Sequence, residues 1–155
     1  MKCNKKSGVI IGLIILLSLF LVVSLIMLFF FQYILPPSKE MAEIAFDINK
    51  SELTTVIEYF NENPDSFYAH KIYARDTAEK IPDDNVKNAV TKLFNRGFVS
   101  IAKQGSQITF LLWVRGMDFG AGIAYSYEAD VEPYIELGIT LDKLDAPQWY
   151  YYEAN

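Results

Sequence analysis

The chain has almost no cysteine or histidine. Its 155 residues include one of each, Cys3 and His70. A disulfide needs two cysteines, and a zinc site needs about four nitrogen, sulfur or carboxylate ligands. A serine or cysteine nucleophile needs a histidine-type base that a third group orients. We therefore expect no metal, no cofactor and no catalytic residue, and we interpret His70 as a partly buried or exposed strand residue.

The shortage of cysteine also bears on the setting of the protein. Small secreted eukaryotic domains usually depend on disulfides, so a domain without them beside a membrane fits a bacterial envelope better. Lipidation is the alternative use of Cys3. The bacterial lipoprotein pattern places its cysteine after the apolar run, however, and Cys3 precedes that run.

Charge is absent from one long stretch, Val9–Phe31. Its weakly polar members are Gly12, Ser18 and Ser24. A helix of that length rises about 35 Å, which exceeds the roughly 30 Å of a bilayer core. The sequence therefore predicts a transmembrane helix over residues 9–33, with the lipid bilayer as its partner.

Lysines flank this run unequally. Lys2, Lys5 and Lys6 precede it, and spans carry their excess of Lys and Arg on the cytoplasmic side. We therefore place the basic tail, residues 1–8, in the cytoplasm and the rest of the chain outside. A cleaved signal peptide is the alternative, but its apolar run is shorter, roughly 7–15 residues, and ends in small residues. We predict an uncleaved, single-pass signal-anchor in the cell membrane.

The part after the predicted span is acidic. It holds all 19 Asp and Glu but 11 of the 14 Lys and Arg, which leaves a formal charge of −8. Such a domain repels phosphate backbones, so nucleic acid is not an expected partner. Anionic lipid headgroups would repel it as well.

Apolar periodicity predicts two clear helices in this part. Ser51–Asn61 has apolar residues at helical spacing, with Ser51 as a plausible N-cap. Asp84–Arg96 has the best apolar stripe and is followed by Gly97. Ser38–Asn49 fits a helix or a strand, and we favour the helix. The predicted organisation is a juxtamembrane linker or helix over residues 34–50 and an extracytoplasmic domain over 51–155.

From Phe98 onward the apolar period changes to two. The strands predicted are Ser66–Ala74, Phe98–Lys103, Gln107–Arg115, Gly122–Tyr127, Ile135–Thr140 and Gln148–Glu153. In the longest, Ile108, Phe110, Leu112 and Val114 are expected to share one face. Helices followed by a run of hairpins predict an α+β fold, in which two or three helices pack on one face of an antiparallel sheet.

Three acidic residues near the end of the chain resemble the start of a calcium loop. Glu128, Asp130 and Glu132 stand two residues apart. An EF-hand loop requires Gly and Glu at the positions that Pro133 and Ile139 occupy here. We interpret the three carboxylates as a solvated charged face.

Four residues form the predicted partner surface. Asp118 lies beside Trp113 in a glycine-rich turn, Gly116–Gly120, that lacks the Gly-Lys-Ser/Thr ending of a phosphate loop. Trp149 and Tyr151 belong to the last aromatic strand. Exposed aromatic side chains stack on sugars or anchor protein partners. Packing of that strand into the core is the alternative interpretation.

The stretch from Lys92 to Glu153 resembles small, uncharacterised, membrane-anchored envelope proteins of bacteria. The matching features are Leu93-Phe94 with Gly97, the strand Ile108–Val114, Gly122–Ser126 and Trp149–Tyr151. These motifs are structural rather than catalytic. The resemblance implies a bacterial envelope setting, and it supplies no functional residue.

We therefore expect a non-catalytic extracytoplasmic interaction module that binds an envelope protein, a peptide or a cell-wall fragment. One alternative is a subunit of a membrane complex that associates through its span, where Gly8 and Gly12 stand at the spacing of close helix pairs. Another is an anchored hydrolase that uses carboxylates from Asp118, Glu128 or Asp130. The sequence leaves the oligomeric state open.

Overall fold

The computed structural model describes residues 5–64, 71–72, 78–116, 119–128, 133 and 139–154. The side chains of residues 5–11, 28–34, 71 and 139 are outside this description. The chain divides into two compact units, Met1–Leu35 and Pro36–Asn155. The second unit, which we call the domain, therefore begins well before residue 51.

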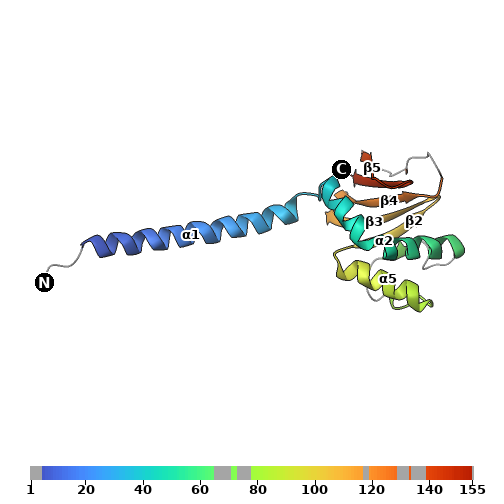
Figure 1. The fold of residues 1–155 in the computed structure, drawn as a ribbon, viewed down its shortest axis with the longest axis horizontal. Coiled ribbons are helices and arrows are strands. Elements are labelled where there is room, and N and C mark those ends of the chain that lie inside the picture. Colours follow the sequence, from blue (N-terminus) through green and yellow to red (C-terminus); the bar gives the residue numbers. More distant parts are fainter. Residues whose placement is uncertain are drawn as a thin grey trace. The chain divides into compact units, whose positions relative to one another are not determined.

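Helix α1, Lys5–Ile34, makes up most of the first unit (Figure 1). Its described apolar side chains are exposed, from 48% at Leu25 to 74% at Leu16. Among the described residues, no helix combines the length and the apolar character that a membrane crossing requires.

Helix α2, Lys39–Glu62, opens the domain as one continuous element. Ser38 is its N-cap, with the side-chain oxygen accepting a hydrogen bond from the Met41 amide at 3.4 Å. The helix predicted over residues 38–49 is therefore confirmed, whereas the predicted N-cap at Ser51 is wrong because the helix runs through it. One buried stripe joins both halves: Ala42, Phe46, Asn49, Leu53, Val56, Ile57, Tyr59 and Phe60.

Helix α5, Asp84–Asn95, confirms the second predicted helix. The Asp83 carboxylate accepts hydrogen bonds from the amides of Asn85 and Val86 at 2.8 and 3.0 Å, which satisfies two unpaired donors of the first turn. The helix packs on α2, where Arg96 Nη1 donates to the buried Asn49 Oδ1 at 2.8 Å. Glu52 lies 3.3 Å from Lys92 and 3.6 Å from Arg96.

The described strands form a six-stranded sheet in the order β1-β2-β3-β4-β6-β5, with every neighbouring pair antiparallel. The bounds are β1 Lys71–Ile72, β2 Ser100–Gln104, β3 Gln107–Arg115, β4 Phe119–Ser126, β5 Ile139–Lys143 and β6 Trp149–Ala154. β3 matches its prediction, whereas β4 starts earlier and β5 ends later than expected. Of the strand predicted over residues 66–74, only 71–72 and their pairing with β2 are described.

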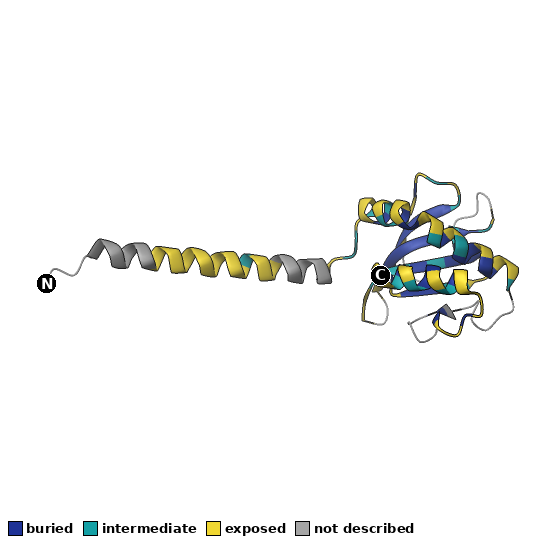
Figure 2. Ribbon diagram, turned by 60° about the horizontal axis from the view of Figure 1, so that its bottom comes forward, coloured by how far each residue is buried: buried dark blue, intermediate teal, exposed yellow. Residues whose placement is uncertain are grey.

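The two faces of the sheet have separate apolar clusters. Ile123 belongs to the main core together with the buried side chains of α2 and α5, whereas its neighbour Ala124 groups with Tyr150 and Tyr152. Since successive strand residues point to opposite faces, both helices cover the same face. Figure 2 shows the strands buried beneath helices whose outer sides are exposed. The predicted α+β architecture with helices on one face is confirmed for the described part of the domain.

A β-bulge interrupts the pairing of β3 with β4. Leu111 pairs with Gly122 and Trp113 with Ala121, which leaves Leu112 as the extra residue. Leu112 packs on the main core as predicted, but the predicted alternation is wrong from Trp113 onward, because Trp113 also packs on the main core and Val114 is 46% exposed.

Gly122 is required opposite this bulge. A Cβ atom there would collide with the Phe110 carbonyl oxygen and would lie 3.0 Å from Leu111 Cα. Both are backbone atoms of a paired strand and have little freedom to move. The bulge therefore fixes glycine at this position.

Contacts along α2 give the domain two distinct ends. The Tyr151 hydroxyl donates to the Pro37 carbonyl at 2.8 Å, and the Tyr127 hydroxyl donates to the Ile57 carbonyl at 2.7 Å. Tyr151 pairs with Ile123, so α2 runs along β4 toward its end at Ser126. The start of α2 and the β3–β4 turn thus share one end of the domain, which we call the proximal end (Figure 1). The other end, with the close of α2 and the β2–β3 turn, is the distal end.

Candidate functional site

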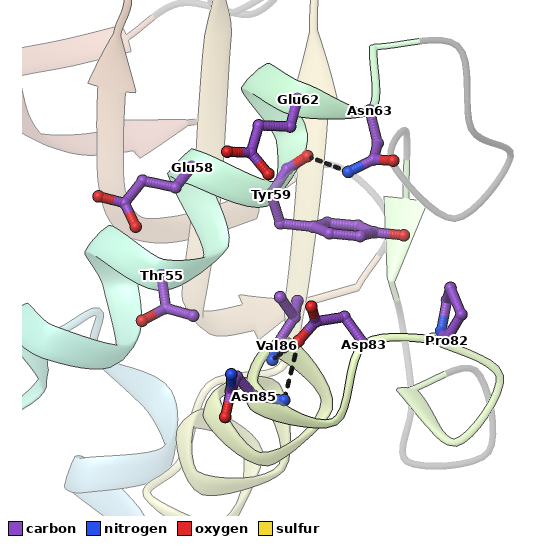
Figure 3. A pocket seen from close by; sticks show the side chains of 9 residues that line it. All are labelled: Thr55, Glu58, Tyr59, Glu62, Asn63, Pro82, Asp83, Asn85 and Val86. Carbon is purple, nitrogen blue, oxygen red and sulfur yellow. Dashed lines mark hydrogen bonds between the residues drawn. The ribbon is translucent and has the colours of Figure 1, made fainter.

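A pocket of about 440 Å³ lies at the distal end of the domain. It separates the last turns of α2 from the start of α5 (Figure 3). Its lining residues are Thr55, Glu58, Tyr59, Glu62, Asn63, Pro82, Asp83, Asn85 and Val86. Its volume is within the usual range for small-ligand sites.

One wall of this distal pocket comes from α2. Glu58 and Glu62 are four residues apart on the helix, so their side chains lie on the same face. Tyr59 is 6% exposed, and Figure 3 shows its ring crossing the space between α2 and the opposite wall. The Asn63 side-chain amide donates to the Tyr59 carbonyl at 3.0 Å, which fixes the end of this wall.

The opposite wall is the beginning of α5. Asp83 lies there, and one of its oxygens is already bound by the first amides of that helix. Together with Glu58 and Glu62 it makes the pocket rich in negative charge and in hydrogen-bond acceptors. The pocket suits cationic or hydroxyl-bearing groups and disfavours phosphates. Within the described ranges, no three His, Cys, Asp or Glu side chains are arranged to hold a metal ion.

A second pocket, about 400 Å³, lies at the β5–β6 turn, over Lys143–Tyr150. Gln148 stands there with a φ of 68°, a left-handed conformation that is uncommon for a residue other than glycine. Its side chain donates to the Tyr127 carbonyl at 3.1 Å and lies 3.3 Å from the Tyr125 hydroxyl. These two contacts hold the turn against β4, so we assign Gln148 a structural role.

Two residues of the predicted partner surface are in the core. Trp149 is 7% exposed and Tyr151 is 4% exposed. The Trp149 ring packs on Phe46 at 4.8 Å and on Tyr125 at 5.0 Å between ring centroids. Neither side chain is available as a contact surface in this structure, which corresponds to the alternative interpretation of core packing. The physical reason is that both side chains lie on the face of the sheet that α2 covers, where the Trp149 ring packs on Phe46.

The other predicted site residues are dispersed or lie outside the described residues. Trp113 is half-buried against the main core. Asp118, Asp130, Glu132 and His70 lie outside the description. Glu128 is exposed, and its carbonyl accepts a hydrogen bond from the Ser126 hydroxyl at 3.1 Å. Of the three carboxylates predicted for a hydrolase, Asp118, Glu128 and Asp130, the structure therefore describes only Glu128.

The pKa of Glu52 is lowered. Burial acts to raise it, but its own backbone amide, the Lys92 hydrogen bond and the charges of Arg96 and Lys92 outweigh that effect. The hydrogen bond from Ser38 lowers the pKa of Glu40. A carboxylic acid that donates a proton in hydrolysis needs a raised pKa, so neither residue has the shift of a general acid.

Buried tyrosines have raised pKa values. Burial, with a contribution from Tyr125, raises the pKa of Tyr127 to about 12. Burial also raises the pKa of Tyr151 to about 12, assisted by Glu153 and Asp142. Burial alone raises the pKa of Tyr152. Because a buried phenolate is disfavoured, these residues hold the domain together only while they keep their protons.

Comparison of the chain with protein-family models, curated proteins and solved structures finds no match. The chemistry of the distal pocket therefore has to be argued from its own residues.

Sequence reasoning did not find the distal pocket. The two helices that form its walls were predicted, and both are present. No local pattern shows that these two helices face each other. The helical spacing of Glu58 and Glu62 was the one available signal, and such pairs are common on solvated helices.

Proposed function

We propose that this chain is a single-pass membrane protein, anchored by its N-terminal helix, whose outward-facing domain is a non-catalytic interaction module. Helix α1 is the observation that carries the anchor. Consecutive apolar residues from Leu13 to Leu17 are all about 60% or more exposed, so every side of the helix is apolar. A helix that is apolar all round needs a lipid or protein environment, because exposed apolar surface costs about 25 cal/mol per Å² in water.

The extent of the span comes from the sequence. The described side chains of α1 cover residues 12–27, which is less than the roughly 20 residues that a bilayer core requires. The uncharged run Val9–Phe31 supplies the remaining length. Lys2, Lys5 and Lys6 support a cytoplasmic N-terminus.

The distal pocket is the part of the domain that best supports partner binding. Its three carboxylates favour a cationic partner, such as lysine or arginine side chains of an envelope protein or peptide, or the amino groups of a cell-wall fragment. It lies at the distal end of the domain, opposite the end at which Pro37 leads into α2.

The anchor is tested on the full-length chain in intact bacterial cells. We expect the chain to stay in the membrane fraction through alkaline carbonate washing, and external protease to remove the domain. Release into the supernatant would contradict the anchor. A domain that resists protease in intact cells but is cut after lysis would contradict the orientation.

Binding is tested with an oligolysine peptide on full-length protein in detergent micelles. Replacing Glu58→Gln together with Glu62→Gln removes two charges from the pocket. Because exposed ion pairs are worth about 0.2–1 kcal/mol each, we expect roughly two- to thirtyfold weaker binding. The matched control is Glu43→Gln with Asp47→Asn, a pair of equal charge and spacing in the proximal half of α2. Equal weakening by both pairs would indicate general charge attraction and contradict the pocket.

A further inference from the structure

The exposed apolar side chains of the domain gather toward one end. Among its described residues, the large ones are Met41, Ile44, Ile48, Val99, Val114 and Phe119. The first three lie in the first half of α2, which begins at the proximal end. Val99 precedes β2, and its amide binds the Leu111 carbonyl at 2.7 Å, at the middle of β3. Val114 and Phe119 flank the β3–β4 turn itself.

The β3–β4 end extends past the point where the chain enters the domain. The Tyr151 hydroxyl, which bonds the Pro37 carbonyl, also lies 3.3 Å from the Glu153 carboxylate, so Pro37 lies beside the stretch of β4 from Ile123 to Ala121. Phe119 stands four residues nearer the turn than Ile123, about 13 Å farther along the strand. Pro37 follows the last residue of α1, Ile34, by three residues, a reach of about 10 Å at most. The turn is therefore within reach of any bilayer that α1 crosses.

The chemistry of this end suits the headgroup region of a bilayer. Val114 and Phe119 are 46% and 47% exposed. Arg115 pairs with Phe119 across the hairpin and is exposed, so its guanidinium can stay at the polar level while its stem lies along apolar surface. Trp113, half-buried on the same strand, is of a residue type enriched at membrane interfaces.

A second copy of the chain is a poorer occupant of this surface. A stable protein interface buries about 1,200 Å² or more in total, and two partly exposed side chains at a hairpin end cannot supply half of that. Shallow insertion into lipid has no such threshold when a membrane anchor already holds the domain at the surface.

We propose that the proximal tip, defined as Val114, Arg115 and Phe119, inserts into the headgroup region of the outer leaflet. This inference rests on the proposed anchor and deepens it. The bilayer then has two points of contact with the chain, and the distal pocket faces away from the membrane. Because the sequence places Asp118 near Arg115, apolar insertion rather than net charge provides the attraction.

The test uses the full-length chain with Cys3→Ser, which removes the only cysteine in the sequence. One new cysteine is introduced as Phe119→Cys or, at the opposite end of β4, as Glu128→Cys. Each is labelled with an environment-sensitive fluorophore and reconstituted into phosphatidylcholine vesicles that contain nitroxide-labelled lipid. We expect a blue-shifted label at 119 that the nitroxide quenches several times more strongly than the label at 128. Val114→Cys provides a second position at the tip.

The outcomes separate the tip from the anchor. Protein that does not float with the vesicles would contradict the proposed anchor. Protein that floats but shows equal quenching at positions 119 and 128 would overturn the tip insertion alone. A blue shift at 119 that grows with the number of chains per vesicle, without nitroxide quenching, would assign the tip to a second copy and also overturn it. For apolar insertion, we expect the quenching at 119 to stay unchanged when phosphatidylglycerol is added to the vesicles. Quenching that occurs only with phosphatidylglycerol would contradict apolar insertion.

Discussion

Two helices of this chain use apolar residues in opposite ways. In α1 the described apolar side chains are exposed on every side, whereas in α2 one stripe is buried and the remaining positions face solvent. Full burial of a Leu or Phe side chain contributes about 1.5–3 kcal/mol, so the stripe of α2 is a main source of the domain's stability. Protein contacts among the described residues give α1 no such stabilisation. If α1 is the proposed anchor, membrane location and folding are encoded in separate regions, and each of the following changes should affect only one of them.

The largest effect is expected from charge in the middle of α1. Replacing Leu17→Arg together with Phe20→Arg should cost about 5–7 kcal/mol of membrane insertion, since each arginine near the centre of a span costs about 2.5–3.5 kcal/mol. We expect the chain to leave the carbonate-resistant fraction while thermal unfolding of the domain is unchanged. Leu17→Val with Phe20→Leu is the control that should stay in the membrane. A domain destabilised by the arginine pair would break the proposed separation.

The converse change is Gly122→Ala in the sheet. The added methyl group meets backbone atoms at the bulge, and we expect a loss of about 3 kcal/mol in the free energy of unfolding. Gly120→Ala on the same strand meets the flexible Leu111 Cδ1 at 2.9 Å and should cost about 1 kcal/mol or less. Denaturant titration measures both, and membrane retention should be unchanged. Equal losses would mean that the bulge does not restrict Gly122.

A smaller effect is expected from Tyr127→Phe, which removes the hydrogen bond to the Ile57 carbonyl and should cost about 1 kcal/mol at neutral pH. The pKa of Tyr127 is about 12 in the folded domain and near 10 when unfolded. Between pH 10 and pH 12 the unfolded state binds fewer protons than the folded state. The hydrogen bond of Tyr127 therefore stabilises the domain fully below pH 10, and its contribution falls as the pH rises toward 12. The difference between wild type and variant in unfolding free energy should therefore shrink above pH 10. A difference that stays constant to pH 12 would contradict the raised pKa.

The smallest effect belongs to Glu52→Gln, between α2 and α5. Lys92 and Arg96 are 60% and 42% exposed, so we expect a loss under about 1 kcal/mol at neutral pH. The pKa of Glu52 is lowered from 4.5 in the folded state, so its contribution is present above pH 4.5 and disappears as the pH falls through the folded value. The unfolding curves of variant and wild type should converge in acid. A gap that widens in acid would contradict the lowered pKa.

Elements with complete local signals were predictable from the sequence. Helix α5 has a capping carboxylate at Asp83 and a left-handed glycine at Gly97, with a φ of 100°, and both act within a few residues. β3 has strict alternation as far as Leu111. Ser51 misled the prediction because its residue type favours helix starts, whereas the buried stripe from Phe46 through Asn49 to Leu53 carries α2 straight past it.

Features that depend on distant pairing were not predictable. Leu111 and Leu112 are identical in type, so no local pattern marks which of them is the bulged residue. The burial of Trp149 and Tyr151 follows from the packing of α2 on their face of β6, a contact between distant parts of the chain. The distal pocket likewise depends on the packing of α2 against α5. The distal pocket therefore could not be predicted for the same reason that parts of the fold were predicted wrongly: both depend on contacts between distant parts of the chain.

The position of β6 also has a consequence for biosynthesis. β5 pairs with β6 alone among the described strands, yet it is synthesised first. During synthesis β5 therefore has no strand partner among the described residues until Trp149–Ala154 has emerged. Premature termination anywhere in that hexapeptide would cost the domain two strands instead of one, and quality-control proteases would meet the exposed edge of β4.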